Sequence, residues 1–268
     1  MRRSNFILGI LLALLVAILL YFYTRTLQEN FQNVENPPKP HAIVIVEPRK
    51  HKLLQPIIEL FDQRMDPKWD LYVFHGSTNA EYAKQSIQNV KHRNTYLHSI
   101  GTDNLTADEY NALFRKQSFW DQIQAEHILV FQTDVVLCKD TPHAIEQFMK
   151  FDYIGCPYEE KKVGKQSTKW EGAPFYGIGG LSYRKKSFMK RCIDAYGHEN
   201  QAEDVLFSKC VDQLSEIKPT SDDLFRFCSQ HSVNPNSFGA HKTQYDIKKE
   251  EKSKLYAFCP EARMLEGT

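Results

Sequence analysis

The stretch HILVFQTDVV, residues 127–136, decides the fold. His127 to Phe131 is a continuous apolar run, and Gln132-Thr133-Asp134 separates it from the apolar pair Val135-Val136. A short apolar run of this kind is typical of a strand that is covered on both faces. A carboxylate between two apolar runs is costly to bury without a partner, so we expect Asp134 to face a crevice. An Asp that only caps the next turn is the alternative, and it is frequent at strand ends.

Upstream of this stretch, strand and helix patterns alternate. Short apolar runs predict strands at residues 42–46, 71–74 and 95–100, and helical spacing predicts helices over residues 53–64, over residues 79–90 and from Thr106. Thr106 and Glu109 have the spacing of a capping box. The alternation predicts an α/β fold with a mostly parallel sheet and helices on both faces. Such sheets bind ligands beyond the carboxyl ends of their strands, here at Glu47-Pro48-Arg49, His75-Gly76 and Gln132-Thr133-Asp134.

Downstream, a strand is expected at residues 152–157, followed by the aromatic and glycine-rich segment WEGAPFYGIGGLSY, residues 170–183. We expect a GGLS turn here, in which Gly179 and Gly180 let the backbone approach a ligand closely. Trp170 and Tyr176 offer flat faces of the kind on which sugar rings stack. A loop of this composition could equally do no more than pack on the sheet.

Two polar motifs follow this segment. Glu203-Asp204 stands at an expected helix start, where acids often only complement the helix dipole, although one of them could act as a general base beside a cation site. Gly239-Ala240-His241-Lys242 combines a metal-capable histidine with a cation. A surface turn is the commoner explanation for such a tetrapeptide.

The N-terminus predicts a membrane anchor. Phe6 to Tyr23 is an uncharged apolar run, which as a helix spans about 27 Å, close to the hydrocarbon core of about 30 Å. Arg2 and Arg3 favour a cytoplasmic tail, residues 1–5. A cleaved signal peptide is the alternative, but Tyr21-Phe22-Tyr23 suits an interfacial anchor better than a cleavage site. Residues 24–40 read as a proline-bearing stalk before a folded domain at residues 41–268.

Composition narrows the function further. The formal net charge of +1 argues against a nucleic-acid-binding protein, which usually has a basic excess. Neither a dinucleotide-binding glycine fingerprint nor a P-loop follows any expected strand. The six cysteines include no C-x-x-C pair, which disfavours structural zinc. In an oxidising lumen we expect one or two disulfides, whose partners the sequence leaves open.

The order of these motifs resembles the glycosyltransferase A fold. VIVEPRKHKLL, LYVFHG, VFQTDVVLC, FDYIGCPY, GGLSYRKKSFM, AEDVLFS and FGAHK together look like a glycosyltransferase family that is classed as a domain of unknown function. The resemblance runs from about Ala42 to Lys242. The Glu-Asp-Val and Gly-Gly-Leu-Ser pieces are also similar to β-1,3-galactosyltransferase-like enzymes, which invert the anomeric centre.

The resemblance, together with the residue types and the rule for strand ends, predicts a role for each motif. Asp134 and His241 would bind Mn²⁺ or Mg²⁺, Asp204 or else Glu203 would be the catalytic base, and Trp170, Tyr176, Gly179 and Gly180 would meet the sugar acceptor. The nucleotide-diphosphate sugar would contact Glu47, Pro48, Arg49, Gln132, Thr133 and Lys242. One departure puts metal use in doubt: the usual D-x-D becomes Thr133-Asp134-Val135, without the second carboxylate.

The expected protein is therefore a metal-assisted, inverting glycosyltransferase that acts on an acceptor hydroxyl of a glycan or glycoconjugate. As a type II membrane protein of the Golgi or endoplasmic reticulum, it would hold its catalytic domain in the lumen. Two alternatives stay open: a retaining transferase on the same fold, and a membrane-anchored carbohydrate-binding protein without activity.

Overall fold

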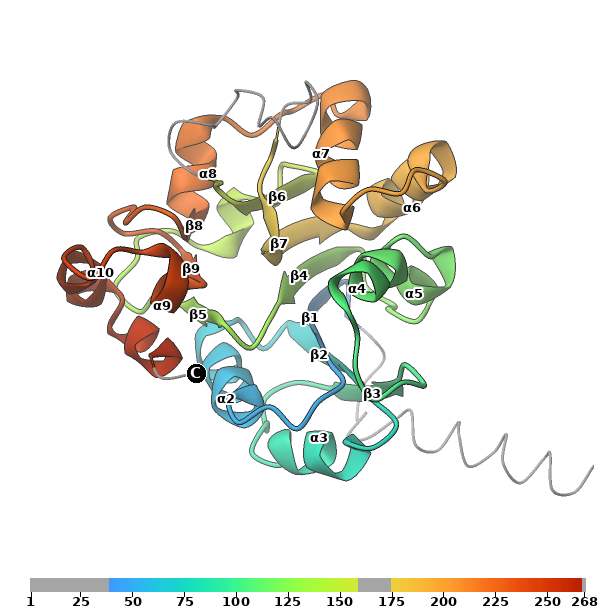
Figure 1. The fold of residues 1–268 in the computed structure, drawn as a ribbon, viewed down its shortest axis with the longest axis horizontal. Coiled ribbons are helices and arrows are strands. Elements are labelled where there is room, and N and C mark those ends of the chain that lie inside the picture. The colour runs from blue at the N-terminus through green and yellow to red at the C-terminus, as the bar shows by residue number, and fades with distance from the viewer. Residues whose placement is uncertain (1–38, 159–174, 267–268) are drawn as a thin grey trace, which may run out of the picture.

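A six-stranded sheet forms the centre of the computed structural model, which describes residues 39–158 and 175–266 (Figure 1). Its strand order is β3-β2-β1-β4-β7-β6. The first four run parallel, whereas β7 is antiparallel to both of its neighbours. The prediction of a mostly parallel α/β sheet is confirmed. The strands are β1 His41–Glu47, β2 Trp69–His75, β3 Thr95–Ser99, β4 His127–Phe131, β6 Tyr153–Cys156 and β7 Ile178–Lys185.

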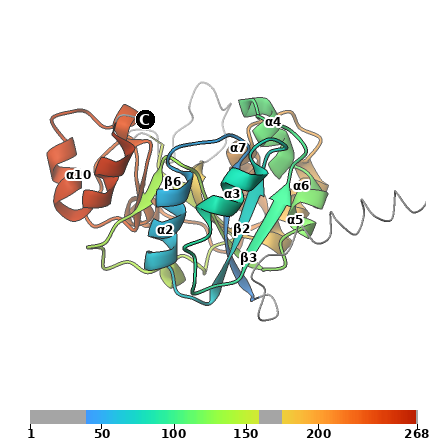
Figure 2. The ribbon, with the colours of Figure 1, turned by 90° about the horizontal axis from the view of Figure 1, so that it is seen from below.

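Side chains alternate along each strand, so the sheet has two apolar faces. Helices cover both of them (Figure 2). In β1, Ile43 and Ile45 belong to one core, and Ala42, Val44 and Val46 belong to the other. The first core includes residues of α2 Leu54–Arg64, α3 Ala80–Ser86, α8 Ser221–Phe227 and α10 Lys252–Phe258. The second includes residues of α4 Ala107–Phe114, α5 Gln117–Asp121, α6 Lys186–Tyr196 and α7 Glu203–Leu214.

A smaller sheet lies beside the carboxyl ends of the central strands. Its order is β5-β9-β8, with β5 Val135–Leu137, β9 Gly239–His241 and β8 Cys228–Ser229. The short helix α9 Thr243–Asp246 follows β9 directly, and the 3₁₀ helices are η1 Ile145–Gln147 and η3 Pro260–Leu265. In Figure 1 this sheet lies between β4 and the C-terminal helices.

Three local predictions need correction. The helix after Thr106 has its predicted capping box but is divided into α4 and α5. The GGLS segment is not a turn, because Gly179 and Gly180 lie within β7, at the register shift between β7 and β6. Residues 239–241 form the buried strand β9 instead of a surface turn.

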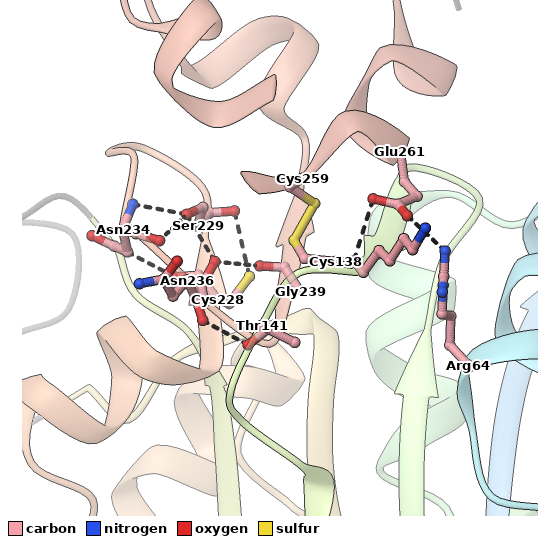
Figure 3. The surroundings of a disulfide bond; sticks show 12 residues. Arg64, Cys138, Thr141, Cys228, Ser229, Asn234, Asn236, Gly239, Cys259 and Glu261 are labelled. Carbon is pink, nitrogen blue, oxygen red and sulfur yellow. Dashed lines mark hydrogen bonds and ion pairs between the residues drawn. A yellow bond between two sulfur atoms is a disulfide. The ribbon is translucent and has the colours of Figure 1, made fainter. Parts of the chain in front are cut away.

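Two disulfides clamp the smaller sheet. Cys138, next to β5, is bonded to Cys259 before η3, and Cys156 at the end of β6 is bonded to Cys228 in β8. Figure 3 shows the first bond, beside which Arg64 forms an ion pair of 2.8 Å with Glu261. The number of disulfides agrees with the prediction, and Cys192 and Cys210 remain free and buried.

Removing the Cys138–Cys259 bond should destabilise the protein strongly. The bond joins residues 121 apart, and in the chain-entropy model a loop of this length contributes about 4 to 5 kcal/mol. We expect the double variant Cys138→Ser/Cys259→Ser to lose that much free energy of unfolding in urea titrations under oxidising conditions. Adding dithiothreitol should then lower the free energy of unfolding of the variant less than that of the wild type. Equal decreases would contradict the Cys138–Cys259 disulfide.

The predicted tail, anchor and most of the stalk lie outside the described residues. Among residues 39–158 and 175–266, no helix has the length and apolarity needed to cross a bilayer.

Candidate active site

The predicted motifs meet at one edge of the central sheet. The parallel strands β1 and β4 end there, which places Glu47 beside the Gln132-Thr133-Asp134 segment. Strand β7 runs the other way and pairs Leu181 with Phe131, so its N-terminal glycines reach the same edge. Strand β9 pairs His241 with Val135, the residue after Asp134. The strand directions therefore bring together segments that are more than a hundred residues apart.

A cavity of about 160 Å³ opens at this edge. It is lined by Glu47, Pro48, Arg49, Gln132, Thr133, Asp134 and Lys242 among the predicted site residues, and also by Val46, Asn104, Leu105 and Tyr110. All six predicted donor-binding residues and one predicted metal ligand thus share a single cavity. Asn104, Leu105 and Tyr110 were not predicted, because the β3–α4 connection and helix α4, from which they come, carry no distinctive motif.

The Glu47–Arg49 pair forms one wall of the cavity. Arg49 Nε and Nη2 donate to the two carboxylate oxygens of Glu47 at 2.8 and 2.9 Å, and the Arg49 backbone N–H donates as well. Glu47 is buried, whereas the Arg49 side chain is 57% exposed. The Asn79 side-chain amide donates to the carbonyl oxygens of both residues, at 3.0 and 2.8 Å, and so fixes this loop. A guanidinium in this position can meet an anionic ligand.

Asp134 and His241 face each other at the back of the site. Asp134 Oδ1 lies 3.4 Å from His241 Nε2, and neither buried atom has a hydrogen-bond partner among the described residues. His241 is fully buried, and the Asp134 side chain is 24% exposed. Burial raises the pKa of Asp134, but nearby groups, among them the positive charge of Lys242, outweigh it and hold that pKa below its usual value. The carboxylate is therefore ionised at neutral pH.

This pair fits a divalent cation. A carboxylate oxygen and an imidazole nitrogen that face each other without a partner are both electron-pair donors. Their separation is near the distance of about 3 Å between adjacent ligands of an octahedral ion with bonds of about 2.1 Å. In residues 39–158 and 175–266, no group of three His, Cys, Asp or Glu side chains could hold a metal. Water or a ligand phosphate would therefore have to complete the coordination.

The two glycines of β7 make room for the polar groups of the site. A Cβ on Gly180 would come within 2.3 Å of His241 Nε2 and 2.8 Å of Gln132 Oε1. A Cβ on Gly179 would come within 1.9 Å of Glu203 Oε1 and 2.8 Å of Arg184 Nη2. The Gly-Gly pair thus separates the Asp134–His241 pair from the Glu203 ion pair and lies against both.

Glu203 forms a buried ion pair with Arg184. Two hydrogen bonds of 2.7 and 3.0 Å join the guanidinium to both carboxylate oxygens, and Arg184 is fully buried. The guanidinium also lies over the ring of Phe114 at 4.8 Å. Both oxygens of Glu203 are engaged, which favours Asp204 over Glu203 as the base. The sequence did not predict Arg184 as a partner of Glu203. Its only indication was its place four residues after Gly180.

Breaking this pair should cost more than breaking an exposed one. Removing one partner leaves an uncompensated buried charge, so we expect Arg184→Met to lose about 3 to 5 kcal/mol of unfolding free energy. The matched control is Lys68→Met, whose partner Glu146 is 48% exposed, and it should lose no more than about 1 kcal/mol. Urea titrations of both variants measure the difference, and similar losses would contradict a structural role for the buried pair.

Asp204 has the properties of a general base. It lies in the first turn of α7, and the Gly179 N–H and its neighbour Val205 N–H face its carboxylate. Burial, together with the adjacent charge of Glu203, raises the pKa of Asp204 to about 7. Its side chain nevertheless stays partly accessible to solvent. A carboxyl group with a pKa near neutrality can both accept and release a proton under physiological conditions.

The predicted aromatic acceptor residues are not brought together at this cavity. Trp170 lies outside the described residues. Tyr176 is 9% exposed and does not line the cavity; its backbone N–H donates to Ser208 Oγ, and its hydroxyl faces Asp212 near the far end of α7. Of the four predicted acceptor residues, only Gly179 and Gly180 lie at the site.

Comparisons with known proteins gave matches to solved structures but none to curated proteins. A mannosyltransferase from Pyrobaculum calidifontis, solved with GDP-Man and Mn²⁺, is 14% identical over 75% of this chain and 62% of its own, with a TM-score of 0.44. S. aureus TarS 1-349 with UDP-GlcNAc is 14% identical over 63% and 52%, with a TM-score of 0.42. The apo form of the glycosyltransferase GlyE from Streptococcus pneumoniae TIGR4 is 11% identical over 80% and 59%, with a TM-score of 0.47.

The chain spans less than two thirds of the length of each of these three structures. A family model matches more than half of the sequence. It matches residues 90–241, from the segment before β3 to His241, and so includes Asp134, the glycine pair, Asp204 and His241. The chain belongs to the family described as "Protein of unknown function (DUF5672)".

Proposed function

We propose that the protein is a glycosyltransferase that uses a nucleotide-diphosphate sugar. The observation that carries this proposal lies at one edge of the sheet, where Asp134, Arg49 and Lys242 line one cavity and His241 faces Asp134. The Asp204 carboxyl group, whose pKa is raised, faces the Gly179 N–H of the glycine pair at the same edge. Ligand binding at the carboxyl ends of parallel strands is the rule for open α/β sheets. The ordered motifs that resemble glycosyltransferases support the same conclusion.

The donor would lie across the cavity. Its nucleotide would border Glu47, Pro48 and Arg49, and its diphosphate would approach Asp134. Lys242 has a left-handed backbone, with φ of 51°, and its side chain lines the cavity, where its ammonium group can contact a phosphate. The amide of Gln132 offers an oxygen next to Gly180.

Asp204 would perform the proton transfer. Its ionised carboxylate accepts the proton of the acceptor hydroxyl while that oxygen forms a bond to the anomeric carbon. The bond from this carbon to the diphosphate oxygen breaks, and the nucleoside diphosphate leaves with the bonding electron pair. Lys242 and Arg49 then face the negative charge of the leaving group. Attack opposite the leaving group inverts the anomeric centre.

Asp134 and His241 would hold Mn²⁺ or Mg²⁺, and a mixed oxygen and nitrogen pair suits Mn²⁺ better than Mg²⁺. Such an ion supplies Lewis-acid neutralisation of the diphosphate charge, an effect of several kcal/mol. Asp134 has the matching charge state, because its pKa lies below the usual value.

The compartment and topology are part of the proposal. The apolar segment at residues 6–23 would anchor the protein as a type II membrane protein of the Golgi or endoplasmic reticulum, with the catalytic domain in the lumen. Two disulfides support an oxidising environment, in which such bonds persist.

A donor screen tests the function. UDP- and GDP-sugars are incubated with the protein and Mn²⁺, and release of nucleoside diphosphate is measured with and without candidate glycan acceptors. We expect turnover with one class of donor, and NMR of the product then separates inversion from retention. Calorimetric binding of nucleotides without turnover would favour a retained but inactive site. If no nucleotide is bound or hydrolysed but a glycan is bound, the carbohydrate-binding alternative would be favoured and the proposal overturned.

A further inference from the structure

A line of polar side chains lies behind His241, on the side away from Asp134. His241 Nδ1 lies 2.9 Å from Gln230 Oε1, and Gln230 Nε2 donates to Asp246 Oδ2 at 3.0 Å. Gln230 is 2% exposed, and His241 is fully buried. None of the sequence motifs includes Gln230 or Asp246.

The smaller sheet explains why these residues meet. Strands β8 and β9 run parallel, with Ser229 beside Ala240, so the next residues, Gln230 and His241, are neighbours. The chain then turns at Lys242 into α9, whose last residue is Asp246, and this single turn returns the Asp246 carboxylate to the Gln230 amide. The Cys156–Cys228 disulfide holds β8 in place.

The line has only one consistent pattern of donors. A carboxylate accepts hydrogen bonds, so the amide nitrogen of Gln230 must face Asp246 and its oxygen must face His241. An amide oxygen is also an acceptor, so the proton of the neutral imidazole must be on Nδ1. The lone pair of Nε2 then points toward Asp134 Oδ1, which is the arrangement that leaves both atoms without a partner.

We propose that Gln230 and Asp246 are positioning residues that hold His241 in the Nδ1–H tautomer and so keep Nε2 free for a cation. Without them, the imidazole could carry its proton on Nε2. The Nε2–H could then donate a hydrogen bond to Asp134, and neither atom would be free to bind a cation. The cation-binding part rests on the proposed function, whereas the tautomer does not. Partners of this kind typically change metal affinity by about 10- to 100-fold.

Two measurements on the full chain test the proposal. The first is the ¹⁵N NMR spectrum of histidine-labelled, metal-free protein, in which His241 of the wild type should show a protonated Nδ1 and an unprotonated Nε2. The second is calorimetric titration with Mn²⁺ alone. We expect Gln230→Met, which keeps the side-chain volume but removes the acceptor, to bind Mn²⁺ about 10- to 100-fold more weakly and to lose the tautomer preference.

The controls separate this role from a merely structural one. Gln213→Met makes the same change at an exposed position of α7 and should keep both wild-type readouts. Asp246→Ala removes the outer partner at a residue that is 24% exposed, so it serves if Gln230→Met does not fold, and its affinity loss should be smaller. Each variant's fold is checked by thermal unfolding.

The outcomes are distinguishable from failure of the proposed function. A wild-type His241 protonated on Nε2, or Mn²⁺ affinities within twofold for wild type, Gln230→Met and Asp246→Ala, would overturn the positioning role. Absence of Mn²⁺ binding to the wild type would instead remove the metal from the proposed function, and the NMR spectra would still decide whether Gln230 sets the tautomer.

Discussion

Replacing Asp204 with Asn is expected to reduce glycosyl transfer by about 10²- to 10⁴-fold, the usual contribution of a general base. The amide has nearly the same shape, but it cannot take the proton of the acceptor hydroxyl. The effect should fall on kcat, measured with saturating donor and acceptor, and should leave donor binding nearly unchanged. A variant that retained more than about a tenth of wild-type kcat would remove Asp204 from the proposed mechanism.

The pH dependence of the wild type provides a second check on Asp204. The base must be ionised, and its pKa is raised to about 7, so kcat/KM should fall about tenfold for each pH unit below 7. A group whose pKa is raised in the folded state makes folding more favourable when protonated, and this advantage is lost as the pH rises through about 7. An Asn side chain does not ionise, so the variant should not lose this stability as the pH rises.

Stability measurements therefore exclude unfolding as the cause of inactivity. Asp204→Asn should be at least as stable as the wild type at pH 8, as measured by thermal unfolding. Asp212→Asn, near the other end of the same helix, is the matched control and should keep normal activity and its normal pH profile. An acid limb near pH 4 in the wild type would contradict the raised pKa.

Replacing Asp134 with Ala is the second change for which we expect a large effect. It removes the only carboxylate that faces His241 among the described residues of the cavity, so Mn²⁺ binding should be lost in calorimetric titrations. Transfer should drop by about 100-fold or more, because metal-assisted neutralisation supplies several kcal/mol and about 1.4 kcal/mol corresponds to a factor of ten.

Asp140→Ala makes the same substitution six residues away, at an exposed position beyond β5, and should behave like the wild type. If Asp134→Ala bound Mn²⁺ with wild-type affinity, the carboxylate–imidazole pair would not be the metal site. If it lost Mn²⁺ but kept full transfer, the reaction would proceed without the metal.

The sequence determined the central sheet and predicted where within it a candidate site would lie. Apolar runs such as residues 128–131 are short and rich in β-branched and aromatic residues, which favours a buried strand. Their alternation with helical spacing favours a parallel arrangement. The rule for carboxyl strand ends then selected Glu47 and Asp134 before any contact was known. The sequence also predicted the start of a helix, since the capping box of Thr106 and Glu109 is confirmed.

The sequence patterns were less reliable where tertiary pairing overrides local preference. Two adjacent glycines suggest a turn, yet Gly179 and Gly180 belong to β7, because the strand pairs with its neighbours on either side of them, at Ile178 and from Leu181 onward. Their missing side chains make room for Glu203 and His241. Likewise, His241 looked like part of a surface turn, but its pairing with Val135 buries it.

The sequence by itself determined that this chain has an apolar N-terminal segment, an α/β sheet and a set of polar motifs at strand ends. Only the tertiary structure decided that Glu203 is bound to Arg184, that Tyr176 points away from the cavity, and that Gln230 and Asp246 stand behind His241. The physical reason is that strand and helix periods are local properties of a sequence, whereas a site depends on contacts between segments whose register is set by the packing of the whole sheet.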